Sequence, residues 1–75
     1  MKPVRYSKHA LRARRFWLVS AAEVLSTMSR PEKTETSPGG TVSATRRQGR
    51  RFLRVTYKEE PAHLFVLSVM PRMRG

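Results

Sequence analysis

The chain has 75 residues, sixteen of them Lys or Arg and five of them Glu, which gives a formal net charge of +11. A chain this short is expected to form a single domain, residues 1–75, with a small core. It contains no Cys and no Asp, which excludes disulfide bonds, cysteine-based zinc sites and a Ser-His-Asp triad in its usual form. With only two His in addition, we expect no metal site and no cofactor.

The basic residues are mostly Arg, which accounts for twelve of the sixteen. The guanidinium of Arg can hold a phosphate at two points, and a large positive charge favours binding to polyanions. The chain has no apolar run near the ~20 residues of a membrane span and no long amphipathic helix. We therefore expect a cytoplasmic protein with nucleic acid as its partner and no membrane association. The alternative is a charged surface that serves only solubility.

The first predicted element is a helix from about Lys8 to Phe16. Ser7 precedes it and can cap its first turn. The spacing of the apolar residues places Ala10 and Trp17 near one face, and we expect Trp17 to anchor the core.

A second helix is predicted from Ala21 to about Met28. Ser20 and Glu23 have the spacing of a capping box, in which each side chain bonds to the backbone of the other residue. Pro31 limits the helix, because the residue before a proline avoids helical geometry.

The middle of the chain is rich in Thr, Ser, Gly and Pro. Residues 34–47 are compatible with a flexible loop. Within them, Thr41–Thr45 has modest strand character and could form an edge strand.

Two strands are predicted in the last third of the chain. In the first, Arg51–Lys58, apolar positions alternate with a second set that includes Arg54. The second, His63–Met70, is almost continuously apolar, which is typical of a central strand covered on both faces, and Pro71 should end it. Together these elements predict an α+β fold in which two N-terminal helices pack on a small antiparallel sheet of three or four strands.

His9 is the first candidate for chemistry, because a histidine can move a proton at physiological pH. The alternative is a surface histidine that only donates a hydrogen bond. Arg54 and Arg51 are the candidates for stabilising negative charge on a phosphate in a transition state. Further candidates for holding nucleic acid are Arg12, Arg15, Arg46, Arg47 and Arg50. Their alternative is a solvated run of charge.

Tyr57 is the aromatic candidate, because aromatic rings beside Arg can stack on exposed RNA bases. Core packing is the alternative for this residue, since it shares a strand face with Leu53 and Val55.

Four short motifs resemble a family of small bacterial domains that is similar to BrnT and, more distantly, to RelE-type toxins of toxin–antitoxin systems. The motifs run Tyr6–Ala10, Val19–Val24, Arg51–Tyr57 and Phe65–Pro71. The family's His matches His9 and its strand Arg matches Arg54. The family also has Arg four and eight residues after its His, where this chain has Ala and Trp.

The resemblance implies a RelE-like fold, a cognate antitoxin as a possible partner, and metal-independent cleavage of RNA. In that reaction the RNA 2′-hydroxyl attacks the neighbouring phosphate, with His9 as general base or acid. A toxin-type endoribonuclease is therefore the leading hypothesis from the sequence. The alternatives are a nucleic-acid-binding module without catalysis and a small interaction protein that binds an acidic partner.

Overall fold

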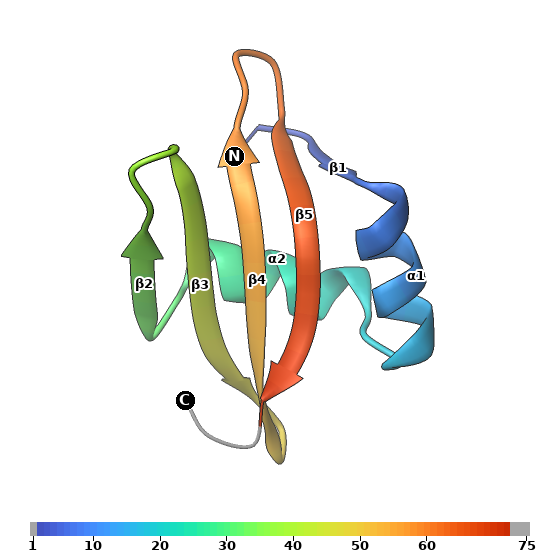
Figure 1. Cartoon of the computed structure of the whole chain (residues 1–75). Coiled ribbons are helices and arrows are strands. Elements are labelled where there is room, and N and C mark those ends of the chain that lie inside the picture. The colour runs from blue at the N-terminus through green and yellow to red at the C-terminus, as the bar shows by residue number, and fades with distance from the viewer. Residues whose placement is uncertain (1, 73–75) are drawn as a thin grey trace.

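The computed structural model describes residues 2–72 and shows an α+β fold with two helices and a five-stranded mixed sheet (Figure 1). In chain order the elements are β1 (Val4–Tyr6), α1 (Lys8–Phe16), α2 (Ala21–Ser29), β2 (Lys33–Thr36), β3 (Thr41–Gln48), β4 (Arg51–Glu59) and β5 (Leu64–Arg72). The α+β class and the two N-terminal helices are confirmed. The prediction of a purely antiparallel sheet with three or four strands was wrong.

The sheet has the strand order β1-β5-β4-β3-β2, and β1 is its one parallel strand. Its three residues pair with the start of β5, from Val4 opposite Leu64 to Tyr6 opposite Val66. β2 lies at the other edge and pairs with β3. Neither edge strand shows an apolar alternation long enough to be recognised, because β1 has three residues and β2 reads Lys-Thr-Glu-Thr.

The hairpin of β2 and β3 takes up most of residues 34–47, for which the sequence was compatible with a flexible loop. Hydroxyl side chains add contacts between its strands and the rest of the sheet. The Ser43 hydroxyl on β3 and the Thr56 hydroxyl on β4 lie 3.1 Å apart. Threonine favours strands even where no apolar face is present. The polar segment forms a strand because β3 pairs with β4 along its whole length.

Both helices begin at the caps that the sequence predicts. The Ser7 side chain accepts a hydrogen bond from the backbone N–H of Ala10 at 3.0 Å. Ser20 and Glu23 form the complete capping box, with bonds of 3.1 Å and 2.9 Å. Ser7 also donates its hydroxyl to the Leu67 carbonyl at 3.1 Å, which ties the start of α1 to β5.

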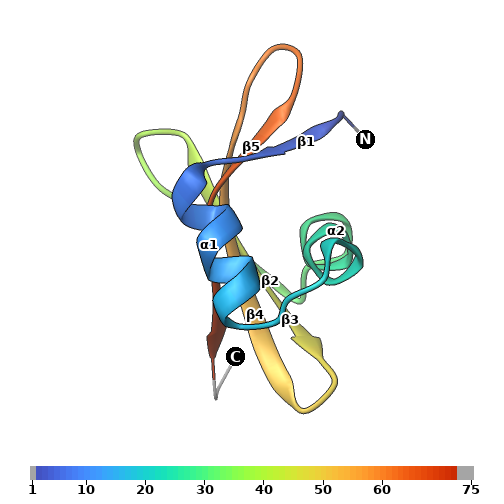
Figure 2. The same ribbon diagram turned by 90° about the vertical axis from the view of Figure 1, so that its right-hand side faces the viewer.

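The core lies between α2 and one face of the sheet. α2 crosses behind the strands, whereas α1 runs along the β5 edge (Figures 1 and 2). Val24 of α2, Leu53 and Val55 of β4, and Val66 of β5 are fully buried there. Burial of such a side chain stabilises the fold by roughly 1.5–3 kcal/mol.

Three details of the prediction were wrong. β5 is covered on one face only, and Met70 on its other face is 50% exposed. Pro71 does not end β5, because β1 pairs only with residues 64–66 and leaves a free edge beyond them, where a proline is tolerated. Trp17 is 41% exposed and does not anchor the core, because α1 lies at the edge of the sheet and its outer side stays uncovered.

Candidate nucleic-acid interface

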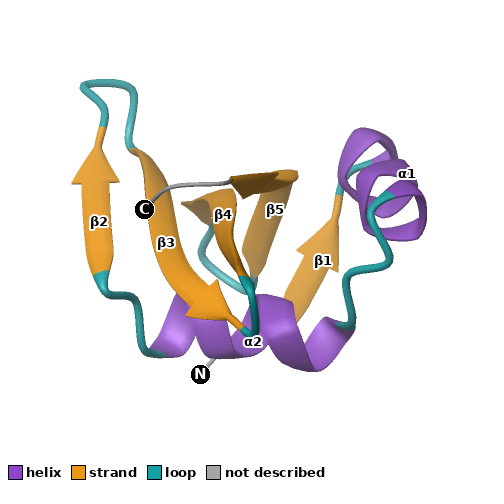
Figure 3. Cartoon of the chain, turned by 90° about the horizontal axis from the view of Figure 1, so that it is seen from below, coloured by secondary structure: helices purple, strands orange, loops and turns teal. Residues whose placement is uncertain are grey.

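The face of the sheet opposite α2 carries no helix among residues 2–72, as the view along the strands in Figure 3 shows. We call it the open face. Because side chains alternate along a strand and paired residues share a face, the register defines its members. The charged and apolar ones on the three long strands are Arg47, Phe52, Arg54, Lys58, Phe65, Met70 and Arg72.

Arg54 lies near the middle of the open face and is half-buried. Its Nη2 donates to the Ser43 hydroxyl at 3.3 Å. In the described part of the chain no carboxylate lies within salt-bridge distance of Arg54. Most of its five N–H donors therefore remain available for an anion.

Arg47 and Phe52 face each other at one end of the open face. The Arg47 guanidinium carbon lies 5.8 Å from the centre of the Phe52 ring, and its Nε donates to the Gly49 carbonyl at 3.0 Å. Gly49 has a φ of +67°, a conformation that suits glycine in the tight turn between β3 and β4. The turn holds Arg47 beside the sheet and leaves Arg50 exposed at its tip.

The open face carries little negative charge. Of the Glu residues on paired strands only Glu35 lies on it, where it forms an ion pair with Lys33 at 3.6 Å. The Glu32 carboxylate, which precedes β2, accepts a hydrogen bond from the Arg47 backbone N–H at 3.2 Å. Glu23 belongs to the α2 cap, and Glu59 accepts a bond from Lys2 at the β4–β5 turn. The remaining cations of this face therefore create a positive field that favours an anionic ligand.

Arg51 and Arg46 lie on the opposite side of the sheet from Arg54. Arg51 donates to the carbonyls of Trp17 and Leu18 at 2.8 Å and 3.2 Å, and its Nη2 is 3.9 Å from the Glu23 carboxylate. Arg46 donates to the Arg30 carbonyl at 2.8 Å. These guanidiniums hold the ends of the two helices, so the structure does not bring Arg51 together with Arg54.

Tyr57 packs partly buried against the core, on the same side as Leu53 and Val55. Burial raises the pKa of its phenol above the ordinary value of 10.0, and the negative charge of Glu59 adds to the effect. Tyr57 therefore takes the core position that the sequence analysis gave as the alternative to stacking on RNA bases.

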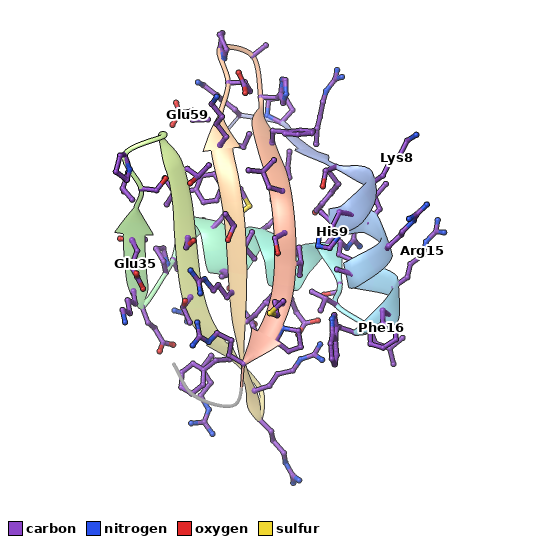
Figure 4. All side chains as sticks on the ribbon, in the orientation of Figure 1. Lys8, His9, Arg15, Phe16, Glu35 and Glu59 are labelled. Carbon is purple, nitrogen blue, oxygen red and sulfur yellow. The ribbon has the colours of Figure 1, made fainter. Side chains whose placement is uncertain are left out.

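His9 is exposed in the first turn of α1, and its side chain is directed toward β5 (Figure 4). Lys8 and Arg15 of the same helix project away from the sheet. Arg12 is exposed. Arg15 lines a shallow groove with Leu11 and Leu18 on the helical side. Of the three α1 residues labelled in Figure 4, His9 is the one directed toward the sheet.

Phe52, Phe65, Lys58 and Arg72 join the site without having been recognised as candidates. Their signal in the sequence is indirect, because it depends on the register of the hairpin formed by β4 and β5. An extra residue at Leu67 shifts that register, so Thr56 pairs with Ser68 and Tyr57 with Val66. If side chains alternated along all of β5 without this shift, the alternation counted from either end of the strand would assign some residues of β5 to the wrong face.

Comparison with models of protein families, with curated proteins and with solved structures found no match to this chain. The resemblance to BrnT and RelE-type toxins therefore stays a hypothesis from sequence motifs. Within residues 2–72, no helix is long and apolar enough to cross a membrane. In the same range, no three His, Cys, Asp or Glu side chains gather as metal ligands would.

Proposed function

We propose that this chain binds RNA through its open face. The observation that carries the proposal is a helix-free sheet surface where Arg47, Arg54 and Arg72 accompany two phenylalanines and one carboxylate, itself paired with Lys33. Arginine supplies bidentate contacts to phosphate, and aromatic side chains on a sheet are a recurrent surface for RNA bases. The excess of Arg in the sequence agrees with this choice.

A surface that serves only solubility would not need the order seen around Arg54. Arg54 is half-buried, and its guanidinium donates to Ser43, whose hydroxyl also lies within hydrogen-bond distance of that of Thr56. A positioned guanidinium loses less side-chain entropy when it binds an anion than a freely rotating one does. This favours a defined contact with phosphate.

The test is a comparison of three single-charge variants in a fluorescence anisotropy titration with a labelled RNA. We expect Arg47→Ala and Arg54→Ala each to weaken binding about tenfold, the usual size of a lost charge-assisted hydrogen bond. Arg30→Ala is the matched control, because Arg30 is exposed at the end of α2, away from the open face. We expect this variant to change RNA affinity by no more than about twofold. Equal losses in all three variants would contradict a defined interface.

Cleavage of the bound RNA is the second candidate function, and the position of His9 favours it. Its side chain is directed toward β5, and one strand spacing of about 4.8 Å separates β5 from β4, which carries Arg54. In this proposal His9 removes the proton of a 2′-hydroxyl, whose oxygen attacks the adjacent phosphorus. The P–O5′ bond then breaks to leave a 2′,3′-cyclic phosphate, the 5′-oxygen takes a proton from water, and Arg54 stabilises the charge that develops on the phosphate.

Cleavage is tested with His9→Ala, assayed for RNA integrity in vitro and for growth arrest on induced expression. We expect the variant to bind RNA like the parent and to produce no fragments, because His9 moves a proton and does not supply the affinity. A His9→Ala protein that cleaves RNA at the parent rate would contradict the role of His9. A parent protein that produces no RNA fragments would leave RNA binding as the function.

The acidic partner expected from the resemblance has a separate surface available. The two helices and their connection expose Leu11, Leu18 and Leu25, with Phe16 at 75% exposure. Arg14 and Arg15 line a groove together with Leu11 and Leu18. We propose that an acidic protein segment, such as an antitoxin, binds there. Co-purification with the product of a neighbouring short reading frame, lost in Leu18→Lys, would support this proposal, and co-purification that Leu18→Lys leaves intact would contradict it.

A further inference from the structure

The strand register arranges the open face in rows that run across β3, β4 and β5. One end row consists of Arg47, Phe52 and Arg72. The row at the opposite end consists of Thr41, Lys58 and Phe65. Each end row therefore combines one aromatic ring with at least one cation.

The rows between these ends are mainly polar. Arg54 pairs with Thr45 on one side and Met70 on the other. The next row is entirely hydroxyl-bearing, with Ser43, Thr56 and Ser68. These groups can bond to phosphate and sugar oxygens but carry no ring that stacks on a base.

We propose that the open face binds single-stranded RNA, with one base stacked on Phe52 and another on Phe65. Arg54 holds the phosphates between them, and Lys58 holds the phosphate beside Phe65. This inference rests on the proposed function and adds to it the strandedness of the ligand, its length and the residues that contact bases. Bases in a duplex are stacked on one another and offer no free surface to these rings.

Both rings are placed where a core phenylalanine would not be. Phe52 and Phe65 are half-buried on a face without a helix, where Met70 is also exposed. Each ring has a side-chain neighbour, since Arg47 lies over Phe52 and the His63 ring meets Phe65 edge-on with centres 6.0 Å apart. Partly exposed aromatic residues with cations beside them indicate a ligand with both flat rings and negative charge.

The distance between the rings sets the length of the ligand. Phe65 pairs with Lys58, which is six residues from Phe52 along β4, so the two rows lie roughly 20 Å apart. A surface of this length fits a strand of several nucleotides, within the roughly 4–16 nucleotides that a single-strand-binding OB fold covers. Shorter strands can contact only one ring at a time.

The parent protein is tested first, because this experiment requires no variant to fold. Labelled single strands of about three and about eight nucleotides, and a duplex of the longer sequence, are titrated by anisotropy. We expect the longer strand to bind at least tenfold more tightly than the shorter strand and than the duplex. Duplex binding as tight as that of the single strand would overturn the inference.

Phe52→Leu and Phe65→Leu then test stacking, because leucine keeps apolar bulk and removes the ring. We expect each to weaken binding of the longer strand about tenfold. Phe16→Leu is the matched control, since Phe16 is an exposed ring at the far end of α1 (Figure 4). Thermal unfolding verifies that each variant is folded.

The two proposals fail in different ways. If Arg54→Ala weakens binding and both Phe variants bind like the parent, RNA binding stands and base stacking is wrong. If neither the Arg nor the Phe variants lose affinity, the proposed function fails as well.

Discussion

Arg51 and Arg54 are three residues apart on β4, yet they lie on opposite faces of the sheet and have different roles. Arg51 donates to two carbonyls in the connection between α1 and α2, whereas Arg54 faces outward beside Ser43. From the sequence, both were expected to stabilise negative charge on a phosphate. Residues an odd number apart on a strand point to opposite sides, so a run of Arg cannot be treated as one cluster.

Arg51 is expected to support the fold and not RNA binding. Arg51→Lys keeps the charge but loses the fork that reaches Trp17 and Leu18 together, which should cost about 1 kcal/mol because the side chain is partly exposed. For a domain of this size the melting temperature should fall by about 4–8 °C. RNA affinity measured in parallel should stay within about twofold. Lower affinity at an unchanged melting temperature would show that Arg51 contacts RNA.

Tyr57 gives the protein a defined weakness at alkaline pH. Because burial raises the pKa of this phenol above 10.0, the folded state keeps its proton at a pH where the unfolded state has lost it. Its contribution is complete below about pH 10 and is lost as the pH rises through the pKa of the folded state. We expect Tyr57→Phe, which cannot titrate, to lose less stability than the parent between about pH 8 and pH 11. Urea unfolding of both proteins measures this, and a difference that does not change with pH would refute it.

At the scale of elements, the helices were predicted well and the edges of the sheet were not. Ser7, Ser20 and Glu23 act within a few residues of themselves, so their effect can be deduced from local sequence. β1 and β2 exist because β5 and β3 offer them partners, and this information lies elsewhere in the chain. The same holds for the coverage of β5, because an apolar run does not reveal whether a second layer is present.

The capping box of α2 should be measurable by itself. Ser20→Ala removes the acceptor for the Glu23 N–H and should destabilise the protein by about 1 kcal/mol, or about 4–8 °C in melting temperature. Ser26→Ala serves as the control, because it changes the same residue type inside the same helix. Equal melting temperatures for the two variants would mean that the cap does not stabilise α2.

The residues of the candidate site also differ in whether local sequence reveals them. His9 and Arg54 could be named from the sequence, because a single His near the N-terminus and an Arg on a strand are visible there. Phe52 and Phe65 could not, because their common surface depends on the bulge at Leu67 and on the absence of a covering helix. Chemistry was therefore easier to recognise than the surface that presents it.

Across the whole molecule, positive and negative side chains are distributed unevenly between the two faces of the sheet. Most of the Glu residues lie away from the open face, while Arg47, Arg54, Lys58 and Arg72 lie on it. Four phosphate contacts to a single strand predict that the logarithm of affinity falls with the logarithm of salt concentration with a slope of about −3. A slope near −8 would indicate that the full charge of +11 acts without a defined site.

The central claim is that the open face is where RNA binds, and mapping the contact by NMR tests it most directly. A nitrogen-15-labelled chain would be titrated with a single strand of about eight nucleotides while its backbone and Arg side-chain signals are followed. We expect the largest shifts in β3, β4 and β5, with Arg54 Nε–H among them, and small shifts in α2. Shifts concentrated on α1 and α2, or spread evenly over all basic residues, would contradict the account.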